Sequence, residues 1–216
     1  MSVAIKQTPL EARLAALDLP KGGFSAPARA EAMARLAAMG LPGARDEYWR
    51  YTNPAELNAA TAPEAKAFEI TDETPIFGAI DRIKLVFVDG VFDAQASDDL
   101  AAEGLEISRL AAADSADIHW ASGLYGTLEC AGQTPVARPL AALNTAAATD
   151  GVLIRVTAKV SKPVHLLYVH KSEISDPILH HCIKLEANSE MTLLENGPAG
   201  ARFNKVLEVD GAEGAR

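Results

Sequence analysis

The spacing of apolar residues changes twice along the chain and divides it into three regions. In residues 1–60, apolar positions recur every three or four residues, as at Leu10 and Leu14, which is the period of an amphipathic helix. Pro42 ends the second of these runs, because proline has no amide hydrogen with which to continue a helix. The first region is therefore predicted to be a helical N-terminal region.

Residues 61–147 combine both patterns and are predicted to be a mixed α/β connecting region. The run IKLVFVD is dense in β-branched and aromatic residues, as a buried strand requires. The dipeptide Asp89-Gly90 follows it and predicts a tight turn into a return strand that begins at Val91. The elements expected here are strands over residues 83–89 and 105–110 and a helix over residues 139–148.

Residues 148–216 read as a series of strands separated by turn residues. Several segments alternate apolar and polar positions, for example at Val152, Ile154 and Val156. The breaks recur at intervals of roughly 12 to 14 residues, which is typical of an all-β array. Both a β-sandwich and a β-solenoid fit this pattern. The expected strands are 151–156, 164–170, 178–186, 191–195 and 203–209.

The sequence stops at Arg216, shortly after the last expected strand. A β array without a capping element exposes unpaired backbone groups, which invites aggregation. We therefore expect the natural protein to continue beyond this point, or another chain to cover the array.

Composition and charge exclude several classes of protein. The 216 residues are 49% apolar, enough for a sizeable core, and the formal net charge is −9. An acidic chain without a Lys/Arg run is a poor partner for nucleic acid, because phosphate contacts need cations. No apolar run approaches the about 20 residues of a membrane span, and the N-terminus has no signal-peptide pattern. With two isolated cysteines and no CxxC pair, we expect a cytoplasmic protein.

The strongest candidate for metal chemistry is the run His180-His181-Cys182, with His165 and His170 upstream. Imidazole and thiolate are good ligands for iron and zinc. On a strand, however, His180 and Cys182 share one face while His181 points to the other, so one side offers two ligands at most. The interpretation adopted is one half-buried cysteine among surface histidines, with no metal site.

Two other groups have a structural and a functional interpretation. The cluster Tyr48-Trp49-Arg50-Tyr51 suits either a core anchor, which is the favoured reading, or an exposed partner-binding site. Cys130 has no base near it in the sequence and is predicted to be a small buried apolar side chain.

Four carboxylates in the β region raise an alternative function. A pair roughly 5 to 9 Å apart would suit a carbohydrate-active β-helix enzyme. Few aromatic residues lie in this region to stack on sugars, and no GxxxxGK[ST] motif is present for ATP hydrolysis. We therefore expect no enzyme. The carboxylates are Glu186, Glu190, Glu195 and Glu208.

Four segments together resemble the SufB/SufD family of iron–sulfur cluster assembly proteins. They occur in the family's order and span most of residues 40–195. The compact helical N-terminus and the WRYT motif are closer to the SufD branch than to the SufB branch. The segments are GLPGARDEYWRYTNPAELN, KLVFVDGVFD, PLAALNTAAATDGVLIRV followed by KPVHLLYVH, and EANSEMTLLE.

The resemblance implies a fold, partners and a scaffold role. The fold would be a helical N-terminal region followed by the first rungs of a right-handed parallel β-helix, here truncated. In the family, SufD pairs with SufB through the β-helices, and both bind the ATPase SufC through C-terminal helices that this sequence lacks. The iron–sulfur cluster is the product of the complete complex. The family's cluster-related residues lie late in the β-helix, so no catalytic, cofactor-binding or metal-ligating residue is expected here.

Overall fold

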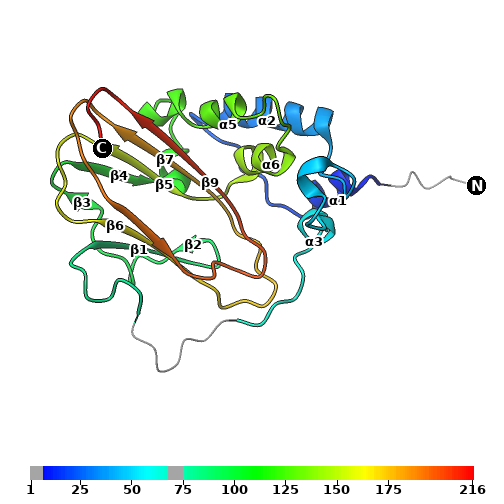
Figure 1. Cartoon of the computed structure of the whole chain (residues 1–216), viewed down its shortest axis with the longest axis horizontal. Helices are drawn as coiled ribbons and strands as arrows, with labels where there is room; N and C mark the ends of the chain where they lie inside the picture. The colour runs from blue at the N-terminus through cyan, green and yellow to red at the C-terminus, as the bar shows by residue number, and fades with distance from the viewer. Residues whose placement is uncertain (1–6, 68–74) are drawn as a thin grey trace, which may run out of the picture.

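A computed structural model describes residues 7–67 and 75–216, and it has a mixed α and β architecture as predicted. Residues 68–74, within the expected connecting region, lie outside the described residues. Two β-sheets lie face to face, and a group of helices covers the outer side of the five-stranded sheet (Figure 1). Among the described residues, no helix combines the length and apolarity needed to cross a membrane.

The predicted helical N-terminal elements are confirmed. Helix α1 begins with a capping box, in which Thr8 and Glu11 satisfy each other's backbone amides. Helix α2 ends at Gly40, whose φ of 72° suits glycine. The helical elements are α1 Pro9–Ala15, α2 Ala26–Met39, η1 Glu47–Trp49, α3 Ala55–Asn58, α4 Leu110–Ala113, η2 Trp120–Gly123, α5 Thr127–Ala131 and α6 Pro139–Ala147.

The strands form a four-stranded sheet, in the order β2-β1-β6-β8, and a five-stranded sheet, in the order β3-β4-β5-β7-β9. All the predicted strands are present, with ends shifted by one or two residues. Their bounds are β1 Ile83–Val88, β2 Val91–Phe92, β3 Ala101–Ala102, β4 Leu105–Arg109, β5 Val152–Val156, β6 Val164–Val169, β7 Ile178–Leu185, β8 Leu193–Asn196 and β9 Asn204–Gly211.

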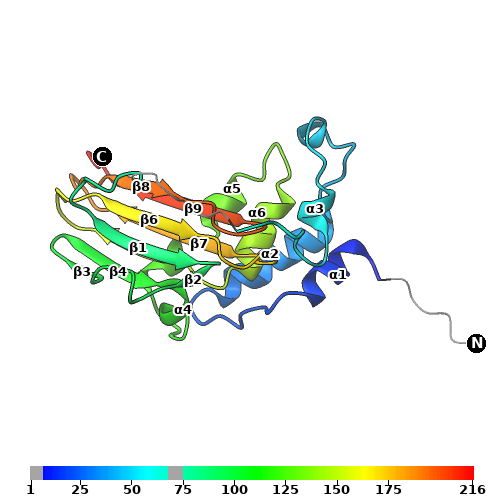
Figure 2. The same cartoon turned by 90° about the horizontal axis from the view of Figure 1, so that it is seen from below.

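From β5 onward the chain alternates between the two sheets, one strand at a time. Strands β5, β7 and β9 lie in the five-stranded sheet and pair in parallel, while β6 and β8 pair in parallel in the other sheet. Leu153 pairs with Cys182, and Cys182 pairs with Glu208. Each pass through both sheets therefore stacks directly on the previous one (Figure 2).

Glycine permits one tight turn and one close approach between strands in this array. Asp89 and Gly90 both have positive φ, 48° and 83°, which gives the predicted hairpin between β1 and β2. At Gly151 an added Cβ would lie 1.9 Å from the carbonyl oxygen of His180, so a side chain there would push β5 away from β7.

Two hydrophobic clusters hold the layers together. One fills the space between the sheets and includes Phe87, Leu166 and Ile183. The other lies between the five-stranded sheet and the helices and includes Leu36 and Tyr125. Strand β7 is covered on both faces, which explains its almost continuous burial, whereas in the second half of β6 the burial alternates, with Leu167 and Val169 only partly buried.

Candidate functional site

A cluster of three buried polar side chains lies between the five-stranded sheet and the helices. His180 and Cys182 point from β7 to this side, and Glu208 occupies the β9 position paired with Cys182. His180, His181 and Cys182 each have an exposed fraction of 0%, so the predicted half-buried cysteine among surface histidines is wrong. The prediction of which side chains share a face is confirmed.

The three side chains are in mutual reach. Nε2 of His180 lies 2.7 Å from Oε2 of Glu208, and Sγ of Cys182 lies 3.9 Å from the same oxygen. One potential ligand atom from each residue lies within 4.8 Å of the other two. The cluster therefore contains an imidazole, a thiol and a carboxylate, which are the ligand types of a transition metal.

Glu208 also holds the first turn of α5 against the sheet. Its Oε2 accepts a hydrogen bond from the backbone amide of Gly126 at 2.5 Å, and its Oε1 accepts one from the amide of Glu129 at 2.8 Å. The carboxylate of Glu129 itself lies against Arg35, Gln133 and Thr145. A single side chain on β9 thus fixes both the β7 cluster and the neighbouring helix.

Burial and hydrogen bonding set the charge of each member. Burial raises the pKa of Glu208, but hydrogen bonds from His180 and the two amides outweigh it and hold that pKa below its usual value. Burial lowers the pKa of His180 and, with the charge of Glu208, raises the pKa of Cys182 well above that of an ordinary thiol. The resting cluster is therefore a carboxylate, a neutral imidazole and a neutral thiol.

One nitrogen of His180 remains unused. The ring stacks on Tyr125, with centroids 4.1 Å apart, and Nε2 donates to Glu208. Nδ1 is buried and has no hydrogen-bond partner among the described residues. Buried polar atoms without partners are rare in native proteins, so this nitrogen calls for an explanation.

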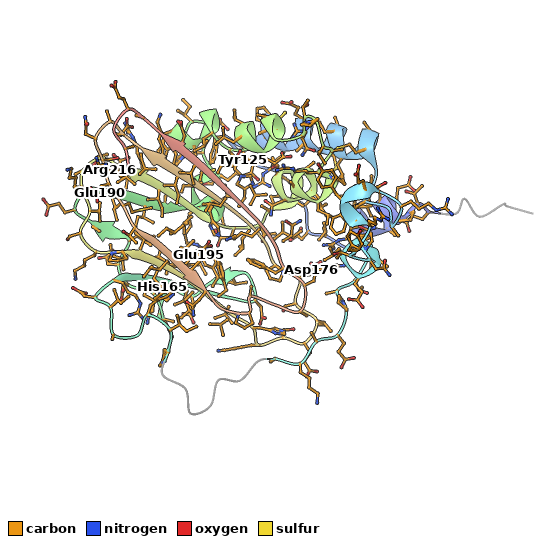
Figure 3. The ribbon with its side chains drawn as sticks, in the orientation of Figure 1. Tyr125, His165, Asp176, Glu190, Glu195 and Arg216 are labelled. Atoms are coloured by element: carbon orange, nitrogen blue, oxygen red, sulfur yellow. The ribbon has the colours of Figure 1, made fainter. Side chains whose placement is uncertain are left out.

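His181 belongs to a separate network on the inner side of β7. Its Nδ1 accepts the amide hydrogen of Val152 at 2.9 Å, so Nε2 carries the ring proton and faces the hydroxyl of Tyr168 at 3.0 Å. That hydroxyl donates to Glu195, which pairs with Lys205. Burial, with the charge of Lys205, lowers the pKa of His181 to about 3. Figure 3 places Glu195 in the four-stranded sheet, opposite the helical side that holds Tyr125.

The other histidines that the sequence groups with this run lie elsewhere. His165 accepts a hydrogen bond from Nε of Arg82 at 2.8 Å and contacts Asn196, while His170 contacts the carbonyl oxygen of Ser172. Both side chains are buried. The structure does not bring them to the cluster of His180, Cys182 and Glu208.

The aromatic cluster of the N-terminal region lies at the surface. Tyr48 and Tyr51 are 72% and 90% exposed, so the predicted core anchor is wrong for both, and the exposed partner-binding alternative fits better. Trp49 is partly buried and lines a groove of about 370 Å³ together with Leu41 and Pro139. The first turn of α6 borders this groove.

Cys130 is only partly buried, so the prediction of a buried apolar thiol is also wrong. Its Sγ lies 3.7 Å from a carboxylate oxygen of Glu31 on α2. It is thus a second thiol that differs from Cys182 in exposure and surroundings.

The carboxylates considered for sugar hydrolysis have separate partners. Glu186 pairs with Arg155, Glu195 with Lys205, and Glu208 with His180. Glu190 lies at the end of the array, near Arg216 (Figure 3). This arrangement gives no support to the alternative of a carbohydrate-active enzyme.

Glu208 is the one member of the cluster that the sequence does not connect with His180 and Cys182. The sequence identifies it only as one of four carboxylates in the β region. Its position opposite Cys182 depends on the pairing of β7 with β9, which strand periodicity alone does not fix. One signal was present: a glutamate in the alternating run VLEVD, at a position that the neighbouring strand could cover.

Comparisons with known proteins identify a family. Residues 24–166 match the family described as SufBD protein N-terminal region. The match runs from just before α2 into β6, and it includes Tyr125 but not the three members of the buried cluster. No curated protein matches the chain.

Proposed function

Because the chain belongs to the SufBD family of iron–sulfur cluster assembly proteins, we infer that it is a scaffold segment of the SufD type in a SUF complex. It contributes a β surface rather than a reactive centre, and the cluster is assembled by the complete complex in the cytoplasm. SufB is the direct partner of this surface. Contact with the ATPase SufC runs through helices that follow the β-helix in the family.

The observation that carries this proposal is the alternating parallel array. Successive strands from β5 to β9 switch sheets and stack in register, as the successive turns of a β-helix do. Residues beyond β9 continue the pattern. The amide of Met191 donates to the carbonyl oxygen of Arg216, and the amide of Arg216 donates to the carbonyl oxygen of Ser189. We infer that the array belongs to a right-handed parallel β-helix, the usual hand of parallel crossovers.

Strand β9 is an edge strand of the five-stranded sheet within the described residues, with β7 as its neighbour. The amides of Asn204 and Ala212 donate to the β7 side, and hydrogen-bonding direction alternates along a parallel strand. The amides of Leu207 and Val209 therefore face outward, and Val209 is 47% exposed. Unpaired amides beside exposed apolar groups are suited to strand addition by a partner.

The proposal predicts that Val209→Pro weakens binding to a SufB subunit from the same source. Proline removes the outward amide at this position but leaves the hydrogen bonds to β7, and it is tolerated at a sheet edge. The affinity of the full chain for SufB, measured by isothermal titration calorimetry, should fall about tenfold, the equivalent of one lost hydrogen bond.

The matched control is Val209→Ala, which shortens the side chain and keeps the amide. Its affinity should stay within about threefold of the unchanged chain, and both variants should keep the parental circular dichroism spectrum. Equal affinities for the proline and alanine variants would contradict pairing through this edge.

A further inference from the structure

We propose that His180, Cys182 and Glu208 form a binding site for one divalent transition-metal ion, with Zn²⁺ preferred. The site lies between β7, β9 and the first turn of α5. It is independent of the proposed scaffold function, because it faces the helical layer rather than the open edge of β9.

The donor set is the first argument. Thiolate, imidazole and carboxylate are all common zinc ligands, with bonds of about 2.0 to 2.3 Å. Ligand atoms around such an ion stand roughly 3.3 to 3.8 Å apart, as tetrahedral geometry with those bond lengths requires. The contacts of 2.7 and 3.9 Å to Oε2 of Glu208 bracket this range, so small rotations of the three side chains suffice.

Charge balance is the second argument. A buried divalent ion is costly unless its ligands neutralise it. Glu208 supplies one negative charge, and Cys182 supplies a second when its thiol proton leaves for solvent as the ion binds. With a neutral imidazole, the loaded site has no net charge.

The unused nitrogen of His180 is the third argument. The contact between Nε2 of His180 and Glu208 places the ring proton on Nε2, which donates to the carboxylate. When Nε2 binds an ion, the proton must move to the other nitrogen. Nδ1 of His180 makes no hydrogen bond within the described residues, so the ring can change its tautomer without breaking a contact at this atom.

A cavity borders Glu208. It has a volume of about 450 Å³ and is lined by Glu208 and Glu129 together with Arg138 and Val209. His180 and Cys182 are not among its lining residues, and the side chain of Glu208 is 2% exposed, so the proposed site lies behind the wall of this cavity.

Cobalt is the appropriate probe, because Co²⁺ bound to thiolate absorbs in the near ultraviolet and Zn²⁺ displaces it. The chelator-treated full chain should bind one Co²⁺ with this charge-transfer band, and Zn²⁺ should abolish the band, following the usual order of affinity. Cys182→Ser should remove the band, and His180→Gln should weaken binding at least about tenfold.

Cys130→Ser is the matched control, because it removes the other thiol and should leave the band and the affinity unchanged. All variants are compared by circular dichroism, so that loss of fold is recognised. A full chain without the thiolate band would overturn the proposal, as would a band that disappears in Cys130→Ser and persists in Cys182→Ser. Either outcome would leave the three residues as a metal-free hydrogen-bonded cluster.

Discussion

Replacing Glu208 with alanine is expected to lower the free energy of unfolding by at least about 3 kcal/mol. The substitution leaves three buried donors without an acceptor: Nε2 of His180 and the amides of Gly126 and Glu129. Each unsatisfied buried donor costs about 1 to 3 kcal/mol. The loss should therefore exceed that of an ordinary surface substitution several times over.

Urea denaturation in the presence of a chelator measures this effect without any contribution from bound metal. Glu190→Ala is the control, because Glu190 is an exposed carboxylate of the same β array. Its change should remain within about 0.5 kcal/mol. If the two alanine variants unfolded at the same urea concentration, Glu208 would not anchor α5 to the sheet.

The second large effect is expected at Asp176, which lies where the helical region meets the end of the sheets (Figure 3). Its carboxylate contacts Arg13 of α1 at 2.7 Å and Arg202 at 2.7 Å, and both arginine side chains are almost fully buried. Arg202 also donates to the carbonyl of Glu56 in α3 and to that of Ala59, which directly follows the helix. One carboxylate thus connects α1, the α3 segment and the chain before β9.

Asp176→Ala should lower the free energy of unfolding by about 3 to 5 kcal/mol, because it leaves two guanidinium groups buried without their counter-ion. Asp81→Ala removes an exposed carboxylate that pairs with Lys162 and should cost less than about 1 kcal/mol. Limited proteolysis should also cut within α1 sooner in Asp176→Ala. Equal stability of the two variants would show that this buried ion-pair cluster does not hold α1 in place.

The local structure was predictable because it depends on neighbouring residues. Alternation in the β region predicted β5 to β9, and the Asp89-Gly90 dipeptide predicted the hairpin between β1 and β2. These signals arise from side-chain direction on a strand and from backbone conformations that few residues adopt. The short elements between residues 110 and 131 were not predicted, because helices of four or five residues carry too little periodicity.

The surroundings of the candidate site were not predictable in the same way. The run His180-His181-Cys182 looked like a strand with one exposed face, and its burial follows from helices that cover the outer side of β7. Polar residues at such positions require partners from other elements, here Glu208 for one face and Tyr168 for the other. Conversely, Tyr48 and Tyr51 lie at the surface, although large aromatic side chains favour burial in a core.

The most direct test of the scaffold proposal is amide hydrogen exchange along β9, measured for the full chain alone and with a saturating SufB subunit. The proposal predicts that the outward amides of Leu207 and Val209 exchange rapidly in the free chain and become protected in the complex. A SufB complex in which these two amides exchange as fast as in the free chain would contradict the claim that the array acts through its open edge.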